Sequence, residues 1–259
     1  MVVPVRVDLN ADVGESFGAY TLGNDAALMP CTTSASMAAG FHAGDPSVLR
    51  RTIRLAASHG VAVGAHPGFP DLVGFGRREI QVAPGEVEDF VLYQIAAVAG
   101  VSAAEGVRLR HVKPHGALYN MAARQEALAA AIARAVAAFD PTLVLFGLAG
   151  SELLKAGRSA GLSVASEVFA DRAYEADGTL RSRMKPDAVI HDASLVVARA
   201  VRMVKEASVV ALDGTLVPIQ ADTICVHGDT PGAEVLAARI REGLEAAGVL
   251  VRAIGRPTV

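Results

Sequence analysis

Short apolar runs alternate with longer amphipathic segments along most of the chain. The runs are rich in Val, Leu, Ile and Ala, which is typical of buried parallel strands. We expect strands at residues 5–9, 35–39, 61–65, 109–113, 143–148, 162–169, 223–226 and 249–254. Apolar positions at helical spacing predict helices between them, at residues 46–59, 84–99, 122–139, 151–160, 193–205 and 233–246.

This alternation predicts one α/β domain, a single β/α barrel over residues 1–259. Strands that alternate with helices pair in parallel through right-handed crossovers. Seven or eight such units in a chain of 259 residues are typical of a barrel, with distorted or seven-stranded forms included. An open doubly wound sheet is the alternative fold. Residues 171–186 and 213–221 are expected to form irregular or hairpin excursions between units.

Composition narrows the class of protein. The hydrophobic share is 52%, which is enough for a large core, and the net charge of −3 argues against binding to duplex nucleic acid. We expect no apolar run to approach the roughly 18 residues of a membrane span, and the N-terminal residues lack the pattern of a signal peptide. Cys31 and Cys225 lie too far apart in sequence to suggest a disulfide framework. A cytoplasmic protein with no nucleic-acid or membrane partner is the expectation.

Polar residues flanked by glycine gather where the predicted strands end. In a parallel barrel the carboxyl ends of the strands meet at one mouth, where active sites lie. We therefore expect one functional site to be built from the segments 8–15, 40–45, 64–68, 111–116, 167–172 and 226–232.

Asp8, Asn10 and Asp12 occupy alternate positions of the first strand, so their side chains should point to the same side. Helix capping or binding of backbone amides explains each residue alone as well as a functional role does. A calcium loop is disfavoured because Ala19 stands where such a loop needs glutamate.

Three histidines, His42, His66 and His115, each lie between small residues that would let a ligand approach. A lone histidine at a strand end is more often structural, but three of them together with the acids of the first strand favour function. His227 is either an active-site or a structural residue, and Asp229 or Thr230 after it would cap the next helix.

Lys113 alternates with His111 and His115 and should point into the barrel mouth. A lysine there would bind a phosphate, a substrate carboxylate or a developing oxyanion, unless it forms a buried salt bridge with an acid of a neighbouring strand. Arg77 and Arg78 lie in a predicted loop over the mouth, where they would hold anions or face solvent.

Several common catalytic motifs are absent from the sequence, namely the GxxxxGK[ST] phosphate loop, GxGxxG after a strand, GxSxG and HExxH. Neither cysteine lies in a glycine-flanked cluster next to histidine. Catalysis by a cysteine nucleophile is therefore not expected.

The strand-end segments resemble the LamB/YcsF family, also called the family of the 5-oxoprolinase A subunit. The resemblance runs from about Val7 to about Gly232 and is carried by DLNADVGE at 8–15, GFHAGDP at 40–46, GAHPG at 64–68, VKPHGALYN at 112–120, EVFADR at 167–172 and HGDT at 227–230. The chain departs from the family pattern at Ser36 and Ala39, where relatives commonly carry Asn and Cys. The change at Ser36 is expected to affect a polar contact near the site.

The resemblance implies a barrel of the glycoside hydrolase/deacetylase type and an ATP-hydrolysing enzyme. The implied reaction opens the lactam of 5-oxo-L-proline to give L-glutamate, with ATP cleaved to ADP and phosphate. It also implies a complex with subunits B and C. Because the chain lacks a standard phosphate loop, nucleotide binding is either unconventional or shared with these partners.

We assign roles to the strand-end residues on this basis. The predicted catalytic residues are Asp12, His66, Lys113 and His115. The predicted substrate-binding residues are Asn10, Glu15, His42, Arg77 and Arg172. A divalent Mg, Mn or Zn ion would be held by Asp8, Asp12, His42 and His66. Two other functions stay open: a metal-dependent amide or carbohydrate hydrolase or deacetylase, and a non-catalytic subunit that supplies a pocket.

Overall fold

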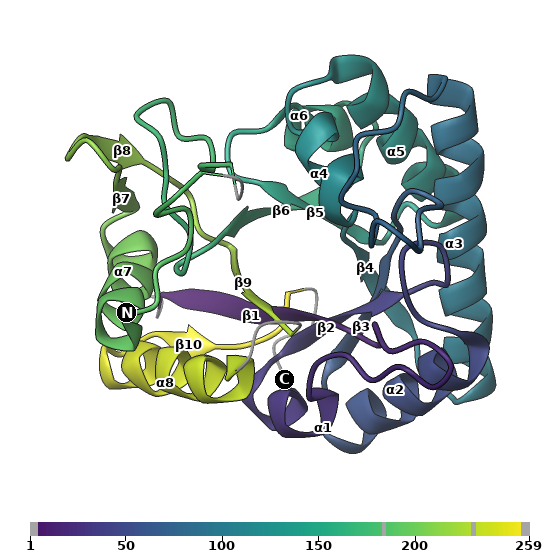
Figure 1. Cartoon of the computed structure of the whole chain (residues 1–259), viewed down its shortest axis with the longest axis horizontal. Helices are drawn as coiled ribbons and strands as arrows, with labels where there is room; N and C mark the ends of the chain where they lie inside the picture. The colour runs from purple at the N-terminus through teal and green to yellow at the C-terminus, as the bar shows by residue number, and fades with distance from the viewer. Residues whose placement is uncertain (1–4, 183–184, 229–231, 255–259) are drawn as a thin grey trace.

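The computed structural model describes residues 5–182, 185–228 and 232–254. Seven of the described strands form a closed parallel barrel in the order β1 (Arg6–Val13), β2 (Ser34–Ala38), β3 (Ala62–His66), β4 (Leu109–Val112), β5 (Val144–Leu148), β6 (Ser163–Val168) and β9 (Thr223–His227). β9 pairs with both β6 and β1 and so closes the ring, which Figure 1 shows from one end. The predicted β/α barrel is confirmed in its seven-stranded form, and the open sheet is wrong.

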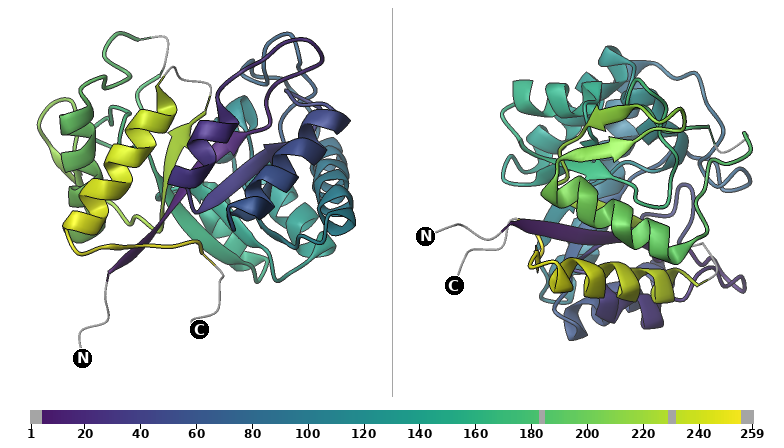
Figure 2. Two further views of the ribbon diagram at one scale, coloured as in Figure 1. Left: turned by 90° about the horizontal axis from the view of Figure 1, so that it is seen from below. Right: turned by 90° about the vertical axis from the view of Figure 1, so that its left-hand side faces the viewer.

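Helices surround the barrel, as the two side views of Figure 2 show. The larger ones are α2 (Pro46–Ser58), α3 (Pro84–Ala104), α5 (Glu126–Phe139), α6 (Glu152–Ser159), α7 (Ala193–Lys205) and α8 (Ala233–Ala246). Asp45, Ser151 and Asp192 cap α2, α6 and α7 by accepting hydrogen bonds from amides of the first turn. These caps begin three helices within a residue of the predicted positions.

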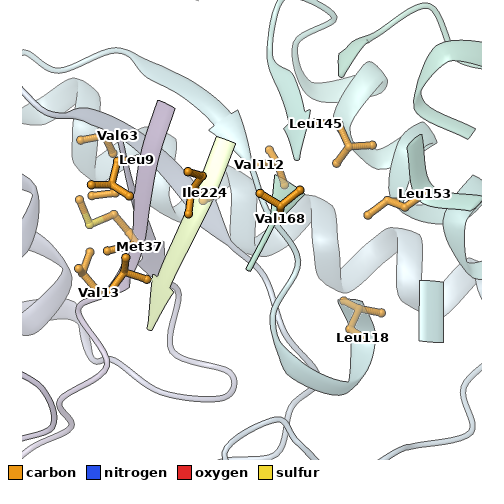
Figure 3. Close-up of a cluster of buried hydrophobic side chains, with 14 of the residues drawn as sticks. Leu9, Val13, Met37, Val63, Val112, Leu118, Leu145, Leu153, Val168 and Ile224 are labelled. Carbon is orange, nitrogen blue, oxygen red and sulfur yellow. The ribbon is translucent and has the colours of Figure 1, made fainter. Parts of the chain in front are cut away.

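The strands bury both of their faces, and the two faces differ in chemistry. In β1 the apolar residues Val7, Leu9 and Ala11 belong to the core, while the alternate positions carry buried Asp8, Asn10 and Asp12. Figure 3 shows Leu9 of β1 near Ile224 of β9, its partner in the sheet register. The helices therefore pack against the apolar outer face of the strands, and the polar side chains point into the barrel.

Several elements differ from the predicted ones. The helix expected at 122–139 begins at Glu126 as α5, because the Ala123 carbonyl accepts from the amide of Glu152 and Gln125 is extended. Ala122 instead ends a short helix that was not predicted, α4 (Gly116–Ala122). The first strand continues to Val13, since its polar residues pair with β2 and β9. The last strand, β10 (Leu250–Val251), is shorter than predicted and pairs with the start of β1.

Small elements complete the chain. The sequence did not indicate α1 (Asp25–Leu28) and the 3-10 helix η1 (Met29–Cys31), which follow the β1 loop. The excursion expected at 213–221 is part of a hairpin: its strand β8 (Leu216–Pro218) pairs antiparallel with β7 (Ser208–Val210), which lies before the predicted range. Asp229 and Thr230, suggested as helix caps, lie outside the described residues.

Helix α3 runs five residues beyond its predicted end and is long and apolar enough, by length and composition alone, to cross a membrane. The expectation that no segment reaches this length does not hold for it. A helix that packs on a barrel can have the same length and apolar composition. α3 is such a helix, because it buries Val91, Ile95 and Val98 and packs on α5 and β3. The absence of a membrane partner stays a prediction.

Candidate active site

A pocket of about 1570 Å³ opens at the carboxyl ends of the strands. Its lining includes Asp12 and Glu15 from the end of β1, His66 from the end of β3, and Lys113 and His115 after β4. All five side chains are buried. The structure thus brings the predicted catalytic residues to one mouth of the barrel.

Lys113 lies inside the barrel between two carboxylates. Its ammonium nitrogen is 2.9 Å from Asp12 Oδ1 and 2.8 Å from Glu167 Oε1. It also donates to Asn10 Oδ1 at 3.1 Å and to Cys225 Sγ at 3.0 Å. Burial opposes the charged amine, but the negative charges of Asp12 and Glu167 outweigh it and raise the pKa of Lys113 well above its usual value. The buried salt bridge left open by the sequence is therefore present.

Glu167 and Tyr119 are site residues to which the sequence assigned no role. Asn10 Nδ2 donates to Glu167 Oε1 at 2.9 Å, and the Glu167 side chain is fully buried. Burial, followed by the charge of Glu167, raises the pKa of the Tyr119 phenol well above its ordinary value. The signal for Glu167 was its place at the end of the sixth predicted strand, among the other acids.

Cys225 faces the same polar layer, which its sequence neighbours did not suggest. Burial raises the pKa of its thiol well above the usual value, although the nearby Lys113 charge works in the opposite direction. The buried thiol therefore stays protonated, which does not suit a nucleophile.

Asp8 lies apart from the histidines, two residues before Asn10 on β1. Its carboxylate accepts hydrogen bonds from the hydroxyls of Thr33 at 2.6 Å, Ser34 at 2.7 Å and Thr223 at 2.6 Å. Burial raises its pKa in spite of these three bonds. The hydroxyls occupy the oxygen atoms that were predicted to bind a metal.

A compact cluster of Glu15, His42, His66 and His115, here called the glutamate–histidine cluster, borders the pocket, which its members Glu15, His66 and His115 line. One possible ligand atom from each residue lies within 4.8 Å of the others, so the cluster could hold a metal ion. The His42 and His115 rings are stacked with centroids 3.7 Å apart and 5° between their planes. Burial and neighbouring histidines lower the pKa of both rings well below the ordinary value, which favours neutral imidazoles.

The cluster overlaps the predicted metal site in part. His42 and His66 belong to both, and Asp12 Oδ1 borders the cluster, 3.4 Å from His66 Nε2. Asp8 lies outside it. Glu15 and His115 were predicted for substrate binding and catalysis, respectively, and here stand among the possible ligands.

Glycines make room for the rings, as the small neighbours in the sequence suggested. A Cβ atom on Gly68 would lie 2.7 Å from His42 Nδ1. Gly76 has φ of +61°, and a Cβ there would lie 2.7 Å from the His42 Cβ. Larger residues at either position would displace His42 from the cluster.

The two arginines predicted to bind substrate differ in their surroundings. Arg172 is buried and donates to the carbonyl oxygens of Ala188 and Arg181, at 3.1 and 2.6 Å. Arg77 is exposed, with its guanidinium carbon 4.8 Å from the centre of the Phe75 ring. Both line the pocket. Arg172 therefore shapes the segment after β6, while Arg77 lies on the rim.

Ser36, one of the two departures from the family pattern, contacts His111 of strand β4. Its hydroxyl lies 3.1 Å from His111 Nε2, and the His111 ring stacks on Phe146 with centroids 4.3 Å apart. His111 does not line the pocket. The side chain of His227 lies outside what the structure describes.

The chain is similar to known proteins over nearly its whole length. The 5-oxoprolinase A subunit of Chloroflexus aggregans is 58% identical over 248 residues, covering 96% of this chain and 98% of the relative. The same-named protein of Bordetella pertussis is 55% identical over 247 residues, covering 95% of this chain and 98% of its own length. The crystal structure of a lactam utilization protein from Thermus thermophilus superposes with a TM-score of 0.92 at 52% identity, covering 96% of this chain and all of that one. Residues 7–258 match the sequence model of the LamB/YcsF family, and the chain belongs to that family.

Proposed function

We propose that this protein is the A subunit of an ATP-dependent 5-oxoprolinase, which hydrolyses the lactam of 5-oxo-L-proline to L-glutamate. The observation that carries the proposal is 54–58% identity, over nearly the full length, to proteins named as the A subunit of 5-oxoprolinase. The name of these relatives supports a role as one subunit of a complex. We propose subunits B and C as its partners and the cytoplasm as its location.

The chemistry asks for groups that this pocket contains. A five-membered lactam is a poor electrophile, and phosphorylation of its amide oxygen by ATP would make it open to attack by water. The substrate carboxylate and the phosphates need cations. Six described arginines line the pocket, namely Arg77, Arg78, Arg124, Arg158, Arg172 and Arg181. We assign the anionic groups to the exposed members of this set, Arg77, Arg78, Arg124 and Arg158, which would replace a standard phosphate loop.

The buried acids and histidines would act on the reacting end of the substrate. Asp12 lines the pocket, with its Oδ1 atom 3.4 Å from His66 Nε2, so the Asp12 carboxylate could take a proton from water. Lys113 compensates the charges of Asp12 and Glu167 and holds both side chains in place. We therefore assign Lys113 a positioning role and not direct contact with phosphate. A divalent metal held by the glutamate–histidine cluster would polarise a carbonyl or phosphoryl oxygen.

The same cluster favours a second candidate, a metal-dependent amide or carbohydrate hydrolase that does not need ATP. A third reading, a non-catalytic subunit that supplies a pocket to the complex, predicts that His115→Ala leaves turnover of the complex intact. ATP dependence separates the first two, and this variant separates the third.

Reconstitution tests the proposal. The purified chain is mixed with the B and C subunits, 5-oxo-L-proline and ATP, and glutamate and ADP are measured together. We expect the two products in equal amounts from the complex and little or none from the chain alone. Glutamate formed without ATP would favour the second candidate. No product from the complete mixture would overturn the proposal, and coupled turnover by the chain alone would overturn the need for partners.

A further inference from the structure

Hydrogen bonds to backbone carbonyls determine which nitrogen of two histidines carries hydrogen. His66 Nδ1 lies 2.7 Å from the Lys113 carbonyl oxygen, and His115 Nε2 lies 2.8 Å from the Phe75 carbonyl oxygen. A carbonyl oxygen only accepts, so each of these ring nitrogens must donate. In the neutral rings, His66 Nε2 and His115 Nδ1 are then left with lone pairs.

Those two remaining nitrogens face each other at 2.9 Å. Two lone pairs at this distance repel unless a positive centre lies beside them. Either a shared proton or a bound cation would relieve the repulsion. In metal sites, a histidine ligand commonly donates a hydrogen bond from its other ring nitrogen to a carbonyl oxygen, and this bond orients the ring toward the metal. His66 and His115 have this arrangement.

The third histidine distinguishes a cation from a shared proton. Both ring nitrogens of His42 are buried and lack a hydrogen-bond partner within the described residues. His42 Nε2 lies 3.4 Å from Glu15 Oε1, and His115 Nδ1 lies 3.7 Å from the same oxygen. A proton between His66 and His115 would leave His42 unsatisfied. One cation within reach of all four residues would satisfy His42 and use the carboxylate charge.

We propose that the glutamate–histidine cluster is a binding site for one divalent transition-metal ion of the zinc type, held by Glu15, His42, His66 and His115. Three imidazole nitrogens and one carboxylate oxygen form a donor set that suits zinc, whereas magnesium prefers oxygen ligands and water. The pocket touches Glu15, His66 and His115, so an ion there can be reached by water and by substrate.

Metal binding can be tested separately from lactam hydrolysis, while the role of the ion in turnover rests on the proposed function. The chain alone is stripped with a chelator and titrated calorimetrically with zinc chloride and, in parallel, with magnesium chloride. Cobalt(II) is added to a third sample, and its visible absorption reports nitrogen and oxygen ligands. None of these measurements requires ATP, 5-oxoproline or partner subunits.

We expect one zinc ion per chain, bound at least ~100-fold more tightly than magnesium. Glu15→Gln and His42→Gln should each weaken zinc binding by ~10–100-fold or more, which is the cost of losing even an outer partner of a metal ligand. Asp8→Asn is the matched carboxylate control and should keep the full zinc stoichiometry. His59→Ala removes an exposed histidine and controls for surface binding.

Three results would overturn the proposal. They are no stoichiometric zinc binding by the unmodified chain, magnesium bound as tightly as zinc, or unchanged zinc binding in the Glu15→Gln/His42→Gln double variant. Thermal unfolding of each variant with and without zinc is the second measurement. Zinc should raise the melting temperature of the unmodified chain and of Asp8→Asn, and leave that of the double variant unchanged. Failure of the reconstituted lactamase assay would not affect any of these outcomes.

Discussion

The Lys113 ammonium lies 2.8 Å from a carboxylate oxygen of Glu167, inside a barrel layer where the two side chains are 3% and 0% exposed. Both charges are almost completely shielded from water, so each depends on the other and on Asp12, the second acid beside the lysine. The arrangement holds one positive and two negative side chains at the base of the pocket.

Replacing Lys113 by Met should destabilise the protein strongly, because Asp12 and Glu167 would be left buried without a compensating charge. Breaking a buried pair in this way costs about 3–5 kcal/mol. Urea unfolding measures the loss.

The matched variant is Glu167→Gln, which keeps the shape but removes one of the two negative charges. The Lys113→Met/Glu167→Gln double variant should recover part of the stability lost in Lys113→Met, because it leaves one fewer buried charge unpaired. A Lys113→Met protein within ~0.5 kcal/mol of the unmodified one, the range for surface changes, would contradict the prediction.

Turnover of the reconstituted complex should fall by roughly a hundredfold or more in Asp12→Asn, His66→Gln or His115→Gln. These residues line the pocket floor, and a lost acid–base or electrostatic group has an effect of this size. His59→Ala, an exposed change, should leave turnover unaffected. Near-normal glutamate formation in all three pocket variants would count against the assignment.

The stability of the protein should fall as the pH drops from about 6.5 toward 3, in part because of His111. Burial, assisted by the Lys113 charge, lowers the pKa of His111 from 6.5 to about 3. Between these values the unfolded chain binds the proton and the folded chain does not, so acid favours unfolding. One such proton contributes about 1.4 kcal/mol per pH unit.

His111→Gln should therefore have a shallower decline of unfolding free energy between pH 6 and pH 4 than the unmodified chain. His42 and His115 have lowered pKa values as well, so part of the decline will remain. Denaturant unfolding at several pH values gives the slopes. Parallel curves for the two proteins would show that His111 already accepts a proton in the folded state.

Gly68→Ala should disturb the glutamate–histidine cluster from outside it. The added Cβ would lie 2.7 Å from His42 Nδ1, and overpacking of this kind costs about 1–3 kcal/mol. Zinc titration and thermal unfolding should both register the change. Gly100→Ala is the control: its Cβ meets nothing within 4 Å, and alanine in helix α3 should stabilise by up to ~1 kcal/mol. Equal behaviour of the two alanine variants would contradict the prediction.

Much of the architecture could be predicted from local patterns. Helices α7 and α8 have the predicted bounds, because amphipathic spacing and, for α7, the Asp192 cap are local signals. Alternation along β1 placed Asn10 and Asp12 on one side, since successive side chains of a strand point in opposite directions. The tendency of parallel strands to gather their carboxyl ends then located the pocket.

The pairing of the polar groups was decided by the tertiary structure. Lys113 meets Glu167 and Cys225 because strands distant in sequence become neighbours across the barrel, at heights set by their register. The same register leaves Asp8 among three hydroxyls, and the loops that follow β1 and β2 bring Glu15 to His42. A sequence pattern gives the direction in which a side chain points, but its height in the barrel and its shielding from water depend on closure of the sheet, and these determine which charges meet.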